Sequence, residues 1–132
     1  MRLGACLGVT VHVIEPTGFI WSEKSLKRAG MDYLDRADIV RHRSYETFCA
    51  EMSGSRLILL TTRGATPYTE FSFQSDDVLM LGRESSGVPD AVHAAADGAI
   101  KVPMRPETRS LNVAVTAAMV LGEALRQCGQ FP

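Results

Sequence analysis

The chain has 132 residues, of which 45% are hydrophobic and 22% are charged, and its formal net charge is −1. This length suits one domain with its own core, so we expect a single domain over residues 1–132, and the composition excludes a disordered or fibrous protein. The near-neutral charge excludes a general basic field, so any RNA contact must come from local basic patches. The candidate patches are Lys24, Lys27 and Arg28, then Arg41 and Arg43, then Arg105 and Arg109.

The first half of the chain alternates strand and helix patterns. Residues 9–15 are rich in β-branched side chains and stop at Pro16-Thr17-Gly18, which predicts a strand followed by a loop. Ser22 is a suitable N-cap for a short helix that Gly30 would end. A second strand is predicted at about residues 38–42.

The next elements follow from capping residues and an apolar run. Ser44 can cap a helix over residues 45–52, which Gly54 would close. Residues 56–62 are almost continuously apolar, which is typical of a strand buried on both faces.

The second half repeats the alternation. Residues 78–81 form a short apolar strand, and Pro89 suits the first turn of a helix that runs to Ala96. Residues 99–104 predict a strand, and residues 110–128 predict a long helix. Together the elements predict an α/β fold with a mostly parallel sheet. Ligands of such sheets bind beyond the carboxyl ends of the strands, so the loops after residues 62, 81 and 104 are the candidate site.

The loop over residues 82–89 follows a buried strand and opens a helix. Gly82 and Gly87 would let backbone amides approach a ligand. The loop begins like a phosphate loop, but Val88-Pro89 replaces the lysine and hydroxyl residue that such a loop needs. It is therefore either a ligand site of another kind or a plain strand-to-helix turn.

The loop over residues 102–112 leads from a strand to the long helix. Ser110 and Asn112 are helix caps by residue type, but polar groups at a helix start can also point at a substrate. Both readings of these two residues stay open at this point.

Other sequence patterns bear on disulfides, metal sites and membrane spans. Cys6, Cys49 and Cys128 are odd in number and widely spaced, and the three histidines are scattered, so we expect no disulfide and no metal. The histidines fit solvated or core positions. No apolar run approaches the roughly 18 residues of a membrane span, so we expect a cytoplasmic protein.

Six stretches, in order and at matching spacing, resemble the SPOUT methyltransferases, and more narrowly the TrmL-type enzymes that modify the wobble nucleotide of tRNA. The stretches are Ile14–Phe19, Lys27–Tyr33, Leu60–Gly64, Leu81–Pro89, Val102–Met104 and Arg109–Ala114. The resemblance implies 2′-O-methylation of ribose in RNA, with S-adenosylmethionine as the methyl donor and S-adenosylhomocysteine as the product. It also implies a parallel sheet with helices on both faces, a deep C-terminal trefoil knot, a homodimer, and tRNA as the partner.

The resemblance assigns roles to particular positions. Glu84 and Asn112 correspond to active-site residues, and Arg2 corresponds to the last arginine of the family's first motif. The expected cofactor-binding residues are Leu60, Thr61, Gly82, Gly87, Val102, Met104, Ser110 and Leu111.

The family assigns the role of base to the arginine that Arg2 matches. Since a guanidinium keeps its proton in proteins, we interpret Arg2 as an electrostatic stabiliser and hydrogen-bond donor. The rest of that motif, a strand and a turn of roughly 20 residues, has no counterpart before Arg2, so we expect a domain truncated at its N-terminus relative to the family. The alternatives are a non-catalytic cofactor- or RNA-binding remnant and a methyltransferase of another RNA.

Overall fold

The computed structural model describes residues 1–18, 22, 24, 36–64 and 66–132. The chain divides into two compact units, Met1–Ser53 with Pro132, and Gly54–Phe131. The division into two compact units does not decide whether they fold together, so the single domain over residues 1–132 stays a prediction. Apart from Ser22 and Lys24, the residues of the helix predicted between Ser22 and Gly30 lie outside the described residues.

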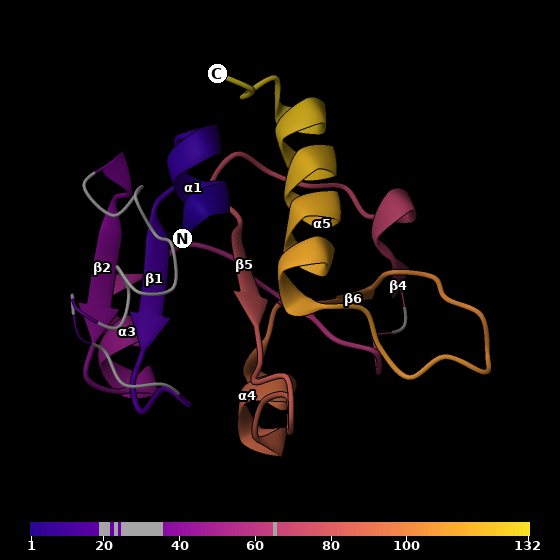
Figure 1. Ribbon diagram of the computed structural model, residues 1–132, viewed down its shortest axis with the longest axis horizontal. Coiled ribbons are helices and arrows are strands. Elements are labelled where there is room, and N and C mark those ends of the chain that lie inside the picture. The colour runs from indigo at the N-terminus through magenta and orange to yellow at the C-terminus, as the bar shows by residue number, and fades with distance from the viewer. Residues whose placement is uncertain (19–21, 23, 25–35, 65) are drawn as a thin grey trace. The chain divides into compact units, whose positions relative to one another are not determined.

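The first unit is built on a pair of parallel strands, β1 (Val11–Ile14) and β2 (Ile39–His42), whose register pairs Val11 with Ile39 and Ile14 with His42. Figure 1 shows the two strands side by side, with α3 (Tyr45–Glu51) following β2. The predicted cap of α3 is confirmed, because the Ser44 hydroxyl accepts a hydrogen bond from the Thr47 amide at 3.2 Å.

A short helix that the sequence patterns did not predict, α1 (Arg2–Leu7), precedes β1. It ends at Gly8, whose φ of +65° is the left-handed conformation that glycine adopts readily. Gly4 lets α1 lie close to β1, because a Cβ at Gly4 would be 2.5 Å from Cγ2 of Val11. The first unit therefore ties the start of the chain to β1.

The second unit contains a four-stranded parallel sheet. Its strands are β3 (Leu57–Leu60), β4 (Thr66–Pro67), β5 (Val78–Leu81) and β6 (Gly98–Lys101), in the spatial order β4-β6-β3-β5. The 3₁₀ helix η2 (Tyr68–Glu70), α4 (Asp90–Ala95) and α5 (Val113–Cys128) complete the unit. The predicted α/β class with parallel strands is confirmed.

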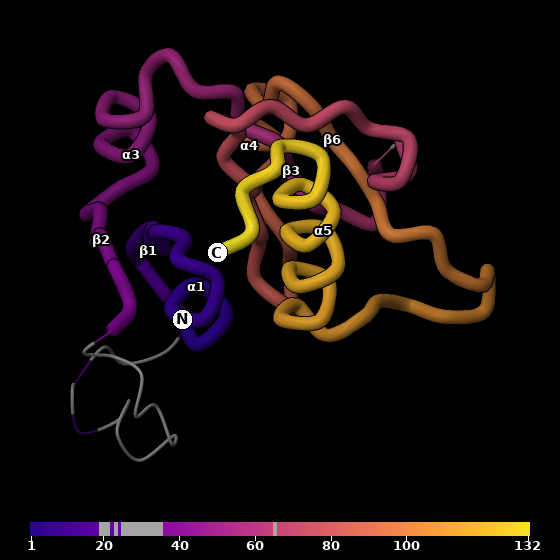
Figure 2. The backbone as a smooth tube through the Cα atoms, turned by 90° about the horizontal axis from the view of Figure 1, so that it is seen from above, coloured from indigo at the N-terminus to yellow at the C-terminus, as the bar shows by residue number. Residues whose placement is uncertain are grey.

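The core of this unit lies between the sheet and α5. Ile58, Leu60 and Ile100 pack with Val120 of α5, and Ile100 and Val120 are fully buried. Figures 1 and 2 both show α5 lying along the sheet. Leu59, which points to the opposite face because strand side chains alternate, is 1% exposed. The apolar run was therefore correctly interpreted as a strand buried on both faces.

Several predicted boundaries were too long. The last strand was expected to reach residue 104 but ends at Lys101, shortly before Pro103, which has no amide hydrogen to donate to a ladder. The long helix was expected from residue 110 but begins at Val113, because the Asn112 side chain caps it. Residues 102–112 therefore form an extended loop, which reaches out from β6 before it returns to α5 in Figure 1.

Candidate functional site

A pocket of about 450 Å³ opens among the loops that follow β3, β5 and β6. The first turn of α5 closes one side of it. This volume is within the ordinary range for small-molecule sites, and its place beyond the carboxyl ends of parallel strands is where such sheets bind ligands. The pocket lies wholly within the second unit.

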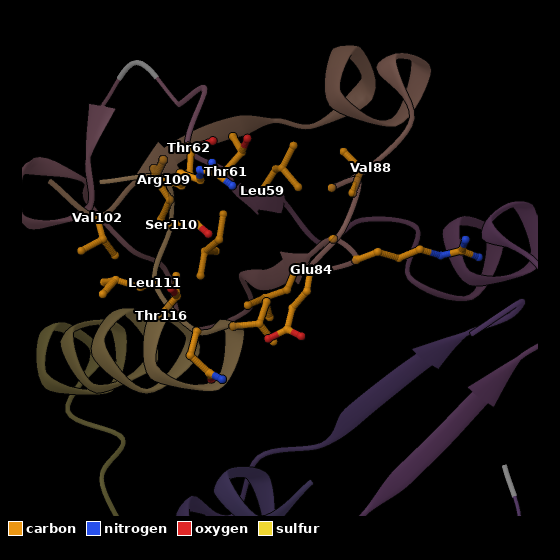
Figure 3. Close-up of a pocket in the computed structure, with 18 of the residues that line it drawn as sticks. Leu59, Thr61, Thr62, Glu84, Val88, Val102, Arg109, Ser110, Leu111 and Thr116 are labelled. Carbon is orange, nitrogen blue, oxygen red and sulfur yellow. The ribbon is translucent and has the colours of Figure 1, made fainter. Parts of the chain in front are cut away.

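The pocket brings together residues that lie far apart in the sequence. All eight predicted cofactor-binding residues line it, namely Leu60, Thr61, Gly82, Gly87, Val102, Met104, Ser110 and Leu111. Glu84 and Asn112, the two predicted active-site residues of this unit, line it as well. In Figure 3, Glu84 from the loop after β5 and Ser110 and Leu111 from the loop before α5 border the same space.

The wall formed by residues 82–87 is a tightly closed loop. The Arg83 amide donates to the Gly87 carbonyl at 3.0 Å, and the Gly87 amide donates to the Arg83 carbonyl at 2.8 Å. Gly87 has a φ of +66°, and a Cβ at Gly82 would be 2.4 Å from the Gly87 carbonyl carbon. Both glycines are therefore needed for the shape of the loop, Gly87 for its backbone conformation and Gly82 for the close approach.

A second close approach lies at Gly64, after β3, against Ile100, which lines the pocket. A Cβ at this position would be 2.5 Å from the carbonyl carbon of Ile100 in β6. The Thr61 amide donates to the Ile100 carbonyl at 2.9 Å, so the loop after β3 is held against the end of β6. No side chain larger than hydrogen fits at Gly64 without moving backbone.

Asn112 has a defined structural task. Its Oδ1 accepts hydrogen bonds from the amides of Ala114 at 2.8 Å and Val115 at 3.4 Å, which caps α5. The capping interpretation of Asn112 is thus confirmed, and that of Ser110 is wrong, since Ser110 precedes the cap by two residues. The Asn112 side chain nevertheless lines the pocket.

The walls of the pocket combine apolar and charged side chains. Apolar side chains come from the strand ends and from both long loops, namely Leu59, Leu60, Leu81, Val88, Ile100, Val102, Met104, Leu111 and Val113. The charged side chains among the described lining residues are those of Arg83, Glu84 and Arg109. Such a pocket suits a ligand that has a flat apolar part and a polar or charged part.

The sequence patterns missed Thr116, which lines the pocket from the first turn of α5. The Thr116 amide donates to the Asn112 carbonyl at 2.9 Å, as expected of residues four apart in a helix. The spacing of four from Asn112 was a usable signal, because it places both residues on one helix face.

The remaining predicted residues are Arg2 and those of the candidate basic patches. Arg2 is the first residue of α1 in the first unit, and its catalytic role remains a prediction. Of the basic patches, Arg109 lines the pocket and Arg41 forms an ion pair with Glu15, while Lys27 and Arg28 lie outside the described residues.

Two kinds of feature are absent from the described part of the chain. Among those residues, no group of three or more histidine, cysteine, aspartate or glutamate side chains could hold a metal ion. None of the helices found there has both the length and the apolar character that crossing a membrane requires.

The fold and the pocket define a parallel α/β protein with a ligand site built from loops and closed by tight glycine contacts. The family model of the SpoU rRNA Methylase family matches residues 1–122. The chain therefore belongs to this family.

Individual relatives are similar over nearly the whole chain. A tRNA (cytidine(34)-2'-O)-methyltransferase of Beijerinckia indica is 57% identical over 131 residues, which are 98% of this chain and 82% of the relative. A solved structure described as "Structural insights into the 2-OH methylation of C/U34 on tRNA" superimposes with a TM-score of 0.89 at 38% identity, covering 96% of this chain and 83% of that one.

A third comparison concerns a cofactor complex. The SpoU methyltransferase AviRb of Streptomyces viridochromogenes, solved in complex with the cofactor AdoMet, superimposes with a TM-score of 0.76 at 25% identity. The match covers 96% of this chain and 53% of that chain.

Proposed function

We propose that this protein transfers the methyl group of S-adenosylmethionine to the ribose 2′-hydroxyl of nucleotide 34, a cytidine or uridine, in tRNA. The observation that carries the proposal is that one pocket gathers all eight predicted cofactor positions with Glu84 and Asn112. The similarity to the enzyme of Beijerinckia indica and to the C/U34 methylation structure supports the choice of tRNA and of the nucleotide.

The residues of the pocket fit S-adenosylmethionine. The apolar walls offer a surface for the adenine ring, and the charged side chains of Arg83, Glu84 and Arg109 offer partners for the carboxylate and ammonium groups. The cradle formed by Gly82 and Gly87 has no room for a Cβ at Gly82, so this part of the wall presents backbone. A wall of backbone without side chains lets a ligand lie close to the chain.

Bound S-adenosylmethionine supplies an activated methyl group on its sulfonium sulfur. The carbon–sulfur bond breaks as a bond from the methyl carbon to the ribose 2′-oxygen forms, and the hydroxyl proton leaves to a base. We assign Glu84 and Asn112 to the reacting nucleotide, Glu84 as a proton or hydrogen-bond acceptor and Asn112 as an amide donor. We assign Arg2 to stabilising the negative charge that develops on the 2′-oxygen.

The proposal includes the trefoil knot of the family. In the second unit, β6 lies between β4 and β3, although β3 and β4 precede it in the chain. The segment after β3 is held across the end of β6 by the contact between Gly64 and Ile100. We propose that the chain that leaves β6 at Lys101 threads past this segment on its way to α5, as the knot of the family requires.

The proposal also includes a homodimer in the cytoplasm, where tRNA is available. Support comes from α5, on which Val115 and Met119 are 48% and 39% exposed. Exposed apolar side chains on one helix are common at interfaces between subunits. Sedimentation of the wild type and of Met119→Lys tests this part, with a dimer expected for the wild type and a smaller species for the variant.

The decisive experiment is single-turnover methyl transfer to unmodified tRNA, followed by mapping of the methylated nucleotide, with binding of S-adenosylhomocysteine measured by calorimetry in parallel. We expect transfer to nucleotide 34. Binding without transfer to any RNA would instead show a non-catalytic remnant. Transfer to another RNA or another nucleotide would overturn the assigned substrate while keeping the chemistry.

A further inference from the structure

The first unit contains a contact between two histidines that the proposed methyl transfer does not use. Nδ1 of His12 on β1 lies 2.8 Å from Nε2 of His42 on β2, and the two ring planes are inclined by 22° with centroids 5.1 Å apart. Since the two residues lie 30 positions apart in the sequence, the contact joins β1 to β2 through side chains.

The surroundings of this contact hold His42 away from water. His42 is 1% exposed, and the ring of Phe48, which is 2% exposed, meets its ring edge-on at 5.2 Å between centroids. Nδ1 of His42 lies 3.2 Å from Oε2 of Glu51, within ion-pair distance but without the alignment of a hydrogen bond. The Glu51 side chain is 54% exposed and can therefore adjust to the charge of the ring.

The distance between the two rings limits how many protons they can carry. A neutral imidazole has one N–H and one bare nitrogen, so a contact of 2.8 Å between nitrogens needs a hydrogen on one and a lone pair on the other. The pair can take up one additional proton without losing the contact, because that proton can bind to Nε2 of His12 or to Nδ1 of His42. When both rings are charged, two N–H groups face each other and the contact is lost.

We propose that the His12–His42 contact is a proton-sensitive connection between β1 and β2, which holds while the pair carries at most one positive charge and opens when both rings become charged. Acid therefore loosens the first unit at the pairing of β1 with β2. This response is built into the packing of β1, β2 and α3.

The charges around the pair set the direction of the pH dependence. Burial lowers the pKa of His12 below its usual 6.5, the nearby His42 lowers it further, and Asp38 and Glu51 act against both. When β1 and β2 separate, His12 regains its ordinary affinity for protons. The contact is thus at full strength above about pH 6.5 and is weakened as the pH falls below it, because the open state then binds more protons than the closed state.

The contact matters for the start of the chain. α1 rests on β1 through the close approach of Gly4 to Val11, and the Val9 amide donates to the Gly4 carbonyl at 2.9 Å. Separation of β1 from β2 would therefore displace α1, which carries Arg2, together with β1. If the proposed function holds, methyl transfer would fall in acid together with the protection of the β1 and β2 amides.

Hydrogen exchange on the full chain tests the proposal without reference to catalysis. After correction for the intrinsic rate at each pH, exchange of the β1 and β2 amides of the wild type should rise about tenfold between pH 7.5 and 5.5, as expected when the open state gains one proton. His12→Asn, which keeps a polar group near the position of Nδ1 but does not titrate, should show less than about a threefold rise. His93→Gln, on α4 of the second unit, is the matched histidine control and should behave as the wild type.

Two further measurements keep the proposal testable even if a variant folds poorly. Titration of the wild-type imidazole resonances should show that the folded pair takes up one proton before β1 and β2 begin to exchange. Glu51→Gln removes a charge that favours protonation of the closed pair, so the opening should move to higher pH. Equal pH dependence in the wild type and His12→Asn, or uptake of two protons with β1 and β2 still protected, would overturn the proposal. Methyl transfer at nucleotide 34 tests the proposed function separately.

Discussion

Gly82→Ala tests whether the loop over residues 82–87 forms a wall of the cofactor site. The new Cβ would lie 2.4 Å from the carbonyl carbon of Gly87, 2.7 Å from its Cα and 2.8 Å from its carbonyl oxygen. All three are backbone atoms, so no side-chain rotation relieves the overlap. The backbone at Gly82 and the backbone at Gly87 must move apart. The hydrogen bonds between Arg83 and Gly87, of 3.0 and 2.8 Å, would be lost or lengthened.

The magnitude follows from those two hydrogen bonds. A net contribution of about 0.5–1.5 kcal/mol each gives a cost of about 1–3 kcal/mol for the closed form of the loop. If S-adenosylhomocysteine binds only the closed form, its affinity should fall about 5- to 150-fold. Calorimetry of the variant and the wild type measures this difference directly, and the thermal midpoint shows whether the variant is folded.

Gly122→Ala is the matched control for this variant. Gly122 lies inside α5, and a Cβ there would meet no atom within 4 Å outside its own helix surroundings. Alanine should stabilise the protein by about 0.5–1 kcal/mol through its helix propensity, with unchanged affinity for S-adenosylhomocysteine. A folded Gly82→Ala protein with the affinity of the wild type would refute the assignment of this loop to the cofactor site.

Four further predictions concern single side chains. Gly87→Val should weaken cofactor binding in calorimetry, because the φ of +66° costs a branched residue about 1–2 kcal/mol or more, although no atom lies within 4 Å of a Cβ there. Glu84→Gln should lower the methyl-transfer rate more than about tenfold, equivalent to about 1.4 kcal/mol, with affinity for S-adenosylhomocysteine within a few-fold; full activity would make Glu84 a structural residue. Asn112→Asp should keep the melting temperature but lose methyl transfer, whereas Asn112→Ala should lower both; an active Asn112→Asp protein would contradict the role of the amide. Hydrogen bonds from Arg126 and Gln127 lower the pKa of Glu123 to about 2, so the ion pair with Arg126 should persist until the pH falls well below 4.5, and a carboxyl titration by NMR that centres near 4.5 would contradict it.

The sequence was most informative where a local pattern decides the structure. The strand over residues 78–81 was predicted with the bounds that β5 has, and the apolar run of β3 was placed with its burial on both faces. Ser44 was identified as the cap of α3 because its residue type and position suffice. The loops of the pocket followed from the general rule that parallel sheets bind ligands beyond their carboxyl ends.

Features that depend on distant contacts could not be predicted in the same way. β4 consists of Thr66 and Pro67 alone, and it is a strand only because β6 pairs with it. The contact between His12 and His42 was missed because the residues looked unrelated in the sequence and only the register of β1 and β2 brings them together. α1 has no side-chain cap at its N-terminus, so the sequence offered no signal for where it begins.

The two readings of Asn112 that the sequence left open turn out to be compatible. Capping engages Oδ1, which accepts from the amides of Ala114 and Val115. The amide nitrogen of the same side chain is a donor, and the cap has no use for it. Because the cap holds Oδ1 at the start of α5 and Asn112 lines the pocket, we expect the amide nitrogen to be ordered before a substrate binds. A residue that seems to be explained by its structural role can therefore supply the preorganised donor that the proposed reaction requires, and an aspartate at this position would keep the cap while removing the donor.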